Sequence, residues 1–226
     1  MSPSTLRLYT VQPTSMVRTL LQEGRLLAKP EFGEEDTPWD WRSAYTWLAQ
    51  QMRTRLFVAA PATAEFPFWA WHFWNGAVQP KPDLRYSSMR RWAKSTERHV
   101  LLEMAVPADG VLLSDYDAWH WVLNYWYLGA ARETCRFERD LKAKGLCFWK
   151  QKPLPDEAEH IRMAKSWERI FDFAAARLVG MPPKNQRIQA TFWSLRADEL
   201  CSAVEFGGDL PRSRKLPVGR LAEALG

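Results

Sequence analysis

The sequence predicts an α+β fold: a single domain with a mixed or antiparallel sheet of about five to seven strands flanked by about four to five helices. Short segments alternate apolar and polar residues as strands do, and longer ones repeat apolar residues at helical spacing. The 226 residues are enough for a substantial core and show no internal repeat. We therefore expect residues 1–206 to form the domain. Residues 207–226 are basic and contain Pro211 and Pro217, which predicts a loosely structured tail with a short final turn.

The chain is expected to open with a strand, a short helix and a glycine. Residues 6–11 alternate as a strand does. Thr14 is expected to cap the helix that follows, and Gly24 is well placed to end it. A second helix is expected over residues 43–57, where apolar residues recur along one face.

Residues 66–74 form the densest aromatic run, Phe-Pro-Phe-Trp-Ala-Trp-His-Phe-Trp. Both faces of a strand with this sequence are apolar, which predicts a strand covered on both sides. Single-stranded nucleic-acid platforms interleave aromatic residues with lysine and arginine, and this run has neither. The run therefore reads as a central core strand from which only Trp69 or Trp71 reaches a pocket.

The later segments follow the same patterns. Residues 99–106 and 111–114 read as two strands, and the short turn between them predicts a hairpin. Asp117 is expected to cap a helix over residues 118–128, and a further helix follows over 132–144. A long helix is expected from Asp156, which forms a capping box with Glu159, to near Leu178. A strand is expected over residues 187–195. The buried stripe expected for the helix is Ile161, Ala164, Trp167, Phe171, Ala174 and Leu178.

Composition limits the classes of function. A net charge of +5 and a pI near 9.2 permit a nucleotide or nucleic-acid partner. No apolar stretch approaches the ~20 residues that span a bilayer, and no signal peptide is evident, so we expect a cytoplasmic protein with no membrane partner. The three cysteines have no CxxC spacing and the four histidines are scattered, so no metal site is expected.

No standard catalytic motif occurs, and the richest polar cluster is residues 112–121. Ser114 is expected at a strand end beside a helix N-terminus, where free N–H groups can bind a ligand. His120, Asn124 and Tyr127 are expected to share one face of that helix. The alternative is an ordinary solvated face with a helix cap.

Other candidate residues lie on predicted strands and helices. Gln189 and Thr191 share a face with Trp193, either as a polar ledge in a nucleotide pocket or as ordinary cross-strand pairs. Glu103 interrupts an apolar strand, as a pocket group or at an exposed sheet face. Tyr9 and Gln12 lie in and just after the first strand, and Arg53 and Arg85 are candidate anion-binding groups.

Several idiosyncratic segments resemble a bacterial family, domain of unknown function 3841. They are Leu8-Tyr9-Thr10-Val11-Gln12-Pro13, Ala44-Tyr45-Thr46-Trp47-Leu48, Phe68-Trp69-Ala70-Trp71, Pro82-Asp83-Leu84-Arg85, Leu113-Ser114-Asp115-Tyr116-Asp117-Ala118-Trp119-His120, Ser166-Trp167-Glu168 and Gln189-Ala190-Thr191-Phe192-Trp193. The resemblance covers residues 6–206 and implies no particular activity.

Residues 6–24 also resemble, more remotely, the start of the ADP-ribosyltransferase-like superfamily. There, a strand carrying a polar NAD contact leads through a short helix into a glycine. Many members carry a late-strand glutamate in a Gln-x-Glu or Glu-x-Glu pattern. The nearest match is Gln189-Ala190-Thr191, with threonine in place of the glutamate.

Three hypotheses follow. The first is an NAD-using ADP-ribosyltransferase-like enzyme, a toxin or modifier, in which NAD is a substrate and no cofactor is fixed. The second is a non-catalytic aromatic pocket that binds a nucleotide, a modified base or nucleic acid. The third is a partner-binding protein, such as half of a toxin–antitoxin pair, and the oligomeric state is left open. The candidate catalytic residues are Glu103 and His120, and the candidate NAD-binding residues are Tyr9, Gln12, Tyr45, Arg53, Trp71, Ser114 and Gln189.

Overall fold

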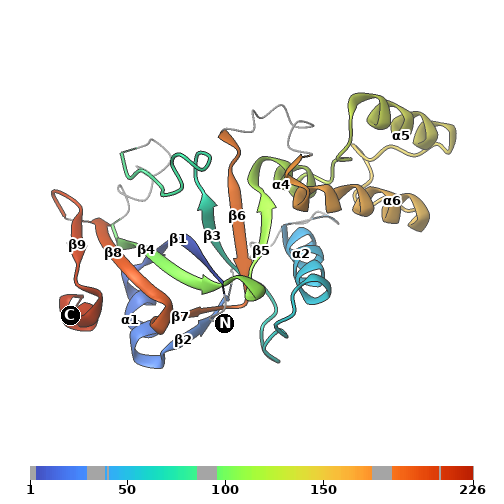
Figure 1. Cartoon of the computed structure of the whole chain (residues 1–226). Helices are drawn as coiled ribbons and strands as arrows, with labels where there is room; N and C mark the ends of the chain where they lie inside the picture. Colours follow the sequence, from blue (N-terminus) through green and yellow to red (C-terminus); the bar gives the residue numbers. More distant parts are fainter. Residues whose placement is uncertain are drawn as a thin grey trace.

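A computed structural model describes residues 4–29, 39, 41–85, 96–174, 185–208 and 210–225. Within them, seven strands pair antiparallel in the order β5-β6-β3-β1-β4-β8-β9, and β2 pairs with β7 in a small second sheet (Figure 1). This confirms the predicted α+β fold. The strands are β1 (Thr5–Pro13), β2 (Arg25–Leu27), β3 (Phe68–Phe73), β4 (Arg98–Pro107), β5 (Leu112–Asp115), β6 (Ile188–Phe192), β7 (Ser194–Arg196), β8 (Leu200–Gly207) and β9 (Arg214–Leu216).

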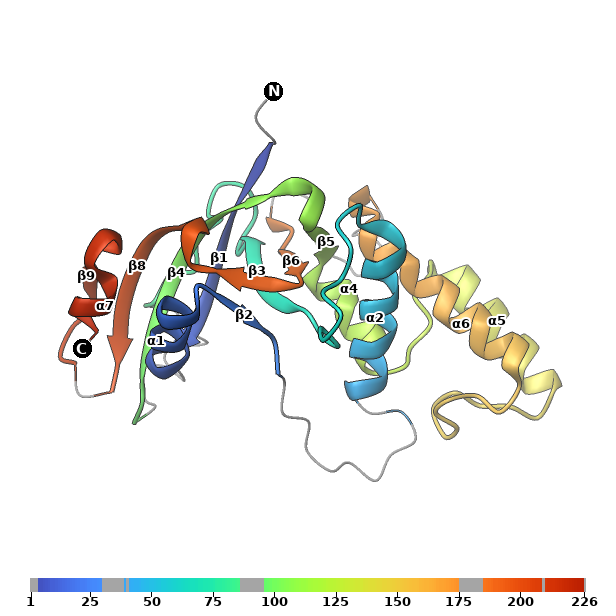
Figure 2. The same ribbon diagram turned by 90° about the horizontal axis from the view of Figure 1, so that it is seen from below.

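The helices cover the two faces of the main sheet at different places. They are α1 (Thr14–Glu23), α2 (Trp41–Arg55), α4 (Tyr116–Leu123), α5 (Ala131–Ala143), α6 (Glu157–Trp167) and α7 (Leu221–Ala224). Helices α1 and α7 pack on one face, against a core that includes Leu8, Phe68 and Leu102. Helices α2 and α4 pack on the other face beside Trp69, and α5 and α6 lie outermost (Figure 2). We call α4, α5, α6 and their connections the helical lobe.

The expected strand, helix and glycine are all present at the start of the chain. Helix α1 buries Val17 and Leu20, and it ends at Gly24, whose φ of 74° is the left-handed conformation that glycine favours. Thr14 is the first helical residue, and Pro13 occupies the cap position without a side-chain hydrogen bond. The prediction that Thr14 is the cap was therefore wrong by one residue.

The aromatic run forms a central strand, as predicted. Strand β3 lies between β6 and β1 and buries Phe68 and Ala70 against the core of one face. Trp69 joins the aromatic cluster under α2 and α4 on the other face. Because strand side chains alternate, both faces of this strand are covered by separate clusters.

The predicted hairpin over residues 99–114 does not form. Strand β4 pairs with β1 and β8, while β5 pairs with β6 at the opposite edge of the sheet. Both sides of β4 are thus occupied, and after the 3₁₀ turn Ala108–Gly110 the chain crosses to the distant edge. A short connection is compatible with a hairpin but does not require one.

Two helices differ from prediction at their ends. Asp115, not Asp117, caps α4 by accepting a hydrogen bond from the Ala118 N–H at 2.8 Å. Asp156 caps α6 as predicted, but α6 ends at Trp167 and continues only as the 3₁₀ turn Glu168–Phe171. The stripe predicted for this helix was wrong at Ile161 and Ala174, which are exposed; Leu178 lies outside the described residues.

The basic C-terminal segment is ordered against the core rather than loosely structured as expected. Strand β9 pairs with β8. Leu216, Leu221 and Leu225 are buried in the same cluster as α1, and α7 is the short final turn that the sequence predicts. Three leucines at the end of the chain thus supply enough apolar surface to anchor a segment rich in charge and proline.

A half-buried histidine couples the helical lobe to pH. The Tyr125 hydroxyl lies 2.6 Å from His160 Nδ1, and burial lowers the pKa of His160. In the unfolded chain the histidine has its ordinary pKa of ~6.5, so the unfolded state takes up the proton first as pH falls. The stability that neutral His160 contributes is therefore fully present above that pH and is lost on acidification.

We expect His160→Gln to lower the free energy of unfolding by about 1 kcal/mol near pH 8, the typical net value of one hydrogen bond. The difference from the wild type should shrink as pH falls below ~6.5. Urea unfolding at several pH values measures this difference. A gap that stays constant with pH would contradict the assignment, and His120→Gln serves as the control.

Candidate functional site

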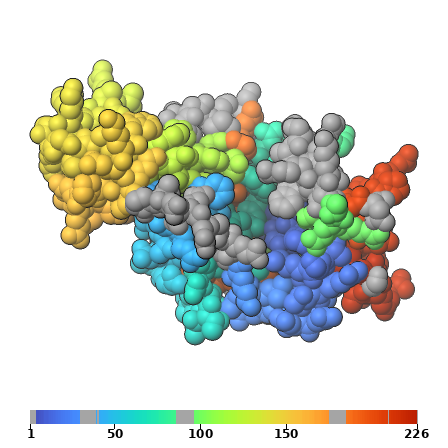
Figure 3. All heavy atoms as spheres, turned by 180° about the vertical axis from the view of Figure 1, so that it is seen from behind, coloured from blue at the N-terminus to red at the C-terminus, as the bar shows by residue number. Residues whose placement is uncertain are grey.

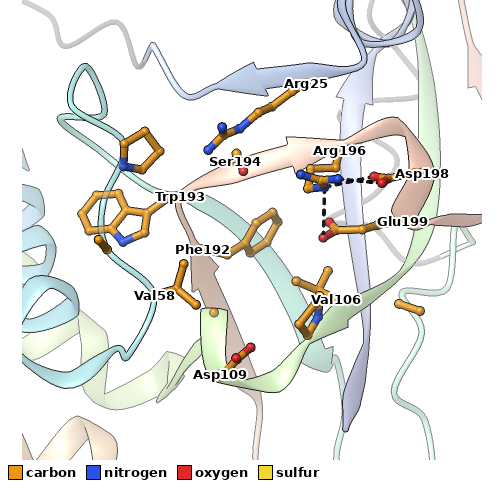
Figure 4. A pocket seen from close by; sticks show the side chains of 15 residues that line it. Arg25, Val58, Val106, Asp109, Phe192, Trp193, Ser194, Arg196, Asp198 and Glu199 are labelled. Atoms are coloured by element: carbon orange, nitrogen blue, oxygen red, sulfur yellow. Dashed lines mark hydrogen bonds and ion pairs between the residues drawn. The ribbon is translucent and has the colours of Figure 1, made fainter. Parts of the chain in front are cut away.

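A cavity of about 400 Å³ lies between the small sheet and one end of the main sheet. Strands β2 and β7 line one side of it, and the turn that follows β4 lines another (Figure 4). Its charged residues are Arg25, Asp109, Arg196, Asp198 and Glu199, and its apolar wall includes Val58, Val106, Phe192 and Trp193.

The start of the chain folds so as to place an arginine on this cavity. Gly24 ends α1, and its carbonyl accepts a hydrogen bond from the Ala197 N–H at 2.9 Å. The next residue, Arg25, begins β2 and lies directly opposite Arg196 of β7. Residues directly opposite each other on antiparallel strands point to the same side, so the two guanidinium groups share one side of the small sheet (Figure 4).

The two arginines differ in their partners. Arg196 donates two hydrogen bonds to the Asp198 carboxylate, at 3.0 and 2.6 Å, and its Nε lies 3.7 Å from Glu199 Oε1. The side chain of Arg25 forms no hydrogen bond or ion pair with any residue in the described ranges. Asp198 and Glu199 offset the charge of Arg196, so the guanidinium of Arg25 is the group on this side of the cavity that can bind an anion.

Glu199 is the most perturbed acid of the cavity. Its side chain is 12% exposed, and its Oε2 atom is buried without a hydrogen-bond partner in the described part of the chain. Burial raises the pKa of Glu199 to about 7, an effect that the nearby charge of Arg196 opposes. A carboxyl group that exchanges its proton near neutral pH is suited to acid–base catalysis.

Two other groups define the far side of the cavity. Asp109, from the 3₁₀ turn after β4, lies across the cavity from Arg25 and Arg196 (Figure 4). Trp193 lies where the chain leaves β6 for β7, and the guanidinium of Arg53 stacks on its ring at 5.1 Å. The predicted site residue Arg53 therefore reaches this cavity only through Trp193.

Five of the predicted site residues form one row across the main sheet. Ser114 lies opposite Gln189, Gln189 opposite Trp71, and Trp71 opposite Tyr9. Tyr9 in turn lies opposite Glu103. Because directly opposed residues share a face, all five side chains lie on the same face of the sheet, where we expected a site.

The polar groups at the Glu103 end of the row have partners, whereas those at the Ser114 end do not. Arg7 forms an ion pair with Glu103 at 2.7 Å, and burial followed by the charge of Glu103 raises the pKa of Tyr9. At the other end, Ser114 Oγ and Gln189 Oε1 are buried without hydrogen-bond partners in the described ranges. Glu103 is therefore held as a structural ion pair outside the cavity just described.

His120 contacts this row indirectly, because the ring of Tyr116 lies between it and Trp71. Its ring centroid lies 4.8 Å from that of Tyr116, which in turn lies 4.9 Å from that of Trp71. The expectation that His120, Asn124 and Tyr127 share a helical face was wrong, because α4 ends at Leu123. Tyr125, two residues after the end of α4, has a positive φ at which the chain turns, and the ring of Tyr127 stacks on that of Phe137.

The remaining predicted residues lie apart. Gln12 donates to Thr10 Oγ1 at 2.9 Å on the opposite face of β1 from Tyr9, because strand side chains alternate. Tyr45 lies edge-on to Trp69 at 5.6 Å, inside the cluster under α2. Arg85 forms a bidentate pair with Asp83 and is highly exposed.

Four residues of this cavity were not predicted from the sequence, namely Arg25, Asp109, Arg196 and Glu199. A late glutamate was sought inside the strand 187–195, whereas Glu199 follows β7. The detectable signal was the charged run Arg196-Ala197-Asp198-Glu199 directly after an alternating strand. Nothing local to the sequence pairs that run with Arg25, because the pairing of β2 with β7 is tertiary.

Comparison with known proteins gives one match. The model of a family described as a domain of unknown function, DUF3841, matches residues 7–201. No curated protein and no solved structure matches significantly. In the described ranges, no group of three or more His, Cys, Asp or Glu side chains could hold a metal ion. No described helix combines the length and apolar character needed to span a membrane.

Proposed function

We propose that the chain, which belongs to the DUF3841 family, is an enzyme that transfers the ADP-ribosyl group of NAD and that the Glu199 cavity is its active site. One observation carries the proposal. Two arginines meet on one rung of the small sheet beside a buried carboxyl whose pKa is about 7. Such a cavity combines an anion-binding edge with an acid–base group.

The arginine pair suits the diphosphate of a dinucleotide. A guanidinium presents a planar fork of N–H donors that matches phosphate oxygens. Arg25 has no partner in the described ranges, so its donors are available to a ligand. A bound diphosphate would also relieve the repulsion between Arg25 and Arg196, so binding should stabilise the small sheet.

The carboxyl groups suit cleavage of a glycosidic bond. As the bond between C1′ of the ribose and the nicotinamide nitrogen breaks, its electron pair leaves with nicotinamide and positive charge develops on the ribose. The carboxylate of Asp109, across the cavity, would stabilise that charge. Glu199 would take the proton of the acceptor's hydroxyl as the acceptor oxygen bonds to C1′.

The layout at the start of the chain also supports this proposal. The strand, helix and glycine that resemble the ADP-ribosyltransferase-like superfamily lead directly into Arg25 at the cavity. Glu199 is a glutamate late in the chain, although it lies beyond the Gln189-Ala190-Thr191 segment where the superfamily pattern would place it. The role first considered for Glu103 is thus assigned to Glu199.

Arg25→Gln tests the anion-binding edge. We expect the variant to bind NAD at least about tenfold more weakly, since a hydrogen bond to a charged group contributes about 1.5–3 kcal/mol. Isothermal titration calorimetry measures affinity, and a nicotinamide-release assay measures turnover. Arg212→Gln, which removes an exposed arginine elsewhere, is the matched control. If the wild-type protein neither binds NAD nor releases nicotinamide, the proposal is wrong.

A further inference from the structure

A second hollow, of about 620 Å³, lies on the helical lobe. It runs between the start of α2, the end of α4 and the connection from α5 to α6. Figure 3 shows the lobe, in yellow, projecting beside α2, in cyan. Its lining includes three tryptophans and two lysines, which are Trp39, Trp41, Trp149, Lys150 and Lys152. We call it the tryptophan groove.

The groove presents flat aromatic surface to solvent. Trp41 is 58% exposed and Trp149 is 57% exposed. The ring of Trp149 lies 5.7 Å from that of Trp126, and the Trp39 Nε1–H donates to the Val122 carbonyl at 3.2 Å. Trp39 and Trp149 are therefore held in place from below, and Trp41 and Trp149 leave large parts of their side chains open to solvent, as a stacking platform requires.

The groove is also positively charged. Lys150 is exposed and forms no ion pair with the described residues. Lys152 Nζ donates to the Asn124 carbonyl at 2.9 Å, which holds the ammonium at the groove. Residues 131–152 carry seven basic and three acidic side chains, and the acidic residues that follow, Asp156, Glu157 and Glu159, do not line the groove.

We propose that the tryptophan groove binds single-stranded nucleic acid. Open aromatic faces stack on unpaired bases, and the ammonium groups of Lys150 and Lys152 neutralise the phosphates between them. The segment Trp149-Lys150-Gln151-Lys152 interleaves an aromatic residue with lysines, which the central run 66–74 does not. A duplex does not fit this chemistry, because its bases are stacked on each other and present no free faces.

A neighbouring hollow adjoins the tryptophan groove. It has a volume of about 310 Å³, shares Trp39 with the tryptophan groove, and is also lined by Arg42, Gln50 and His160. An unpaired strand can therefore continue past Trp39 toward these polar groups. Since neither hollow shares a lining residue with the Glu199 cavity, this inference does not rest on the proposed enzymatic function.

Fluorescence anisotropy with a labelled oligothymidylate of about 16 nucleotides tests the proposal. We expect Trp149→Ala to weaken binding about 5- to 150-fold, the range for loss of one base–aromatic stack. Phe57→Ala, which removes an exposed aromatic residue outside the groove, should bind as the wild type does. An oligouridylate of the same length distinguishes DNA from RNA as the preferred strand.

Lys150→Gln gives an independent readout that does not depend on packing. The slope of log affinity against log salt should become shallower by about 0.7, the value for one phosphate contact on a single strand. Arg212→Gln should leave the slope unchanged. The proposal fails if the wild type does not bind the oligothymidylate at low salt, if a duplex binds equally well, or if neither Trp149→Ala nor Lys150→Gln differs from the wild type.

Discussion

Replacing Glu199 with glutamine is expected to slow nicotinamide release by about 10²- to 10⁴-fold, the usual contribution of a positioned acid–base group. The amide keeps the size and polarity of the side chain but cannot accept the acceptor's proton. Affinity for NAD should change little, because the binding energy comes mainly from Arg25 and Arg196. Glu223→Gln, which makes the same change at an exposed glutamate outside the cavity, is the matched control.

Because Glu199 titrates near neutral pH, the turnover and the stability of the wild type should depend on pH in opposite directions. As a general base, Glu199 must be ionised, so turnover of the wild type should rise with pH through about 7. Stability should move the other way. The folded pKa lies above the ordinary value of 4.5, so the contribution of Glu199 to stability is fully present below that value and is lost as pH rises through about 7.

Glu199→Gln should therefore be more stable than the wild type near pH 8, although it is far less active. Thermal unfolding at several pH values measures this gain and does not require any substrate. A variant whose stability tracks that of the wild type at every pH would show that Glu199 is not a buried acid. Loss of activity without that stability change would point to a binding role instead.

Trp167→Ala is expected to cost about 3–5 kcal/mol of unfolding free energy, as large-to-small changes of buried aromatic residues do. Trp167 is fully buried, and its Nε1–H donates to the Trp126 carbonyl at 2.8 Å. Its ring lies within 5.5 Å of those of Trp39, Trp47 and Tyr125. The substitution removes the ring at the centre of the cluster that joins α2 to the helical lobe.

Urea unfolding measures this loss, and the exposed Trp149 supplies the control. Trp149→Ala should cost at most about 1 kcal/mol, because it creates no buried cavity. A loss of comparable size in the two variants would mean that Trp167 is not the central packing residue of the lobe. Since Trp149 also lies in the tryptophan groove, the same purified variant serves both tests.

The alternation of apolar residues was enough to predict much of the sheet. Residues 66–74 have two apolar faces, and the structure places β3 between two other strands. The order of strands could not be predicted in this way. Residues 99–106 and 111–114 looked like a hairpin because they are adjacent in sequence, but pairing depends on which strands already occupy each side of β4.

In the candidate sites, too, local patterns could be predicted from the sequence, whereas contacts between distant segments could not. Tyr9, Trp71 and Gln189 were selected separately as polar or aromatic groups on strands, and strand register aligned them in one row. Arg25 and Glu199 were missed, because a charged residue near a strand end is usually solvated and only tertiary pairing joins these two segments. The tryptophan groove was missed because its walls come from α2, α4 and a connection.

The placement of the helical lobe has a consequence for folding order. The lobe leaves the sheet after Asp115 and returns before Ile188, and these two residues are register partners on neighbouring strands. Joining β5 to β6 therefore closes a very long loop, whose entropic cost falls if helices form inside it first. We expect the lobe to gain its helices before the edge strand docks, so that β5 is among the last parts of the sheet to become protected from hydrogen exchange during refolding.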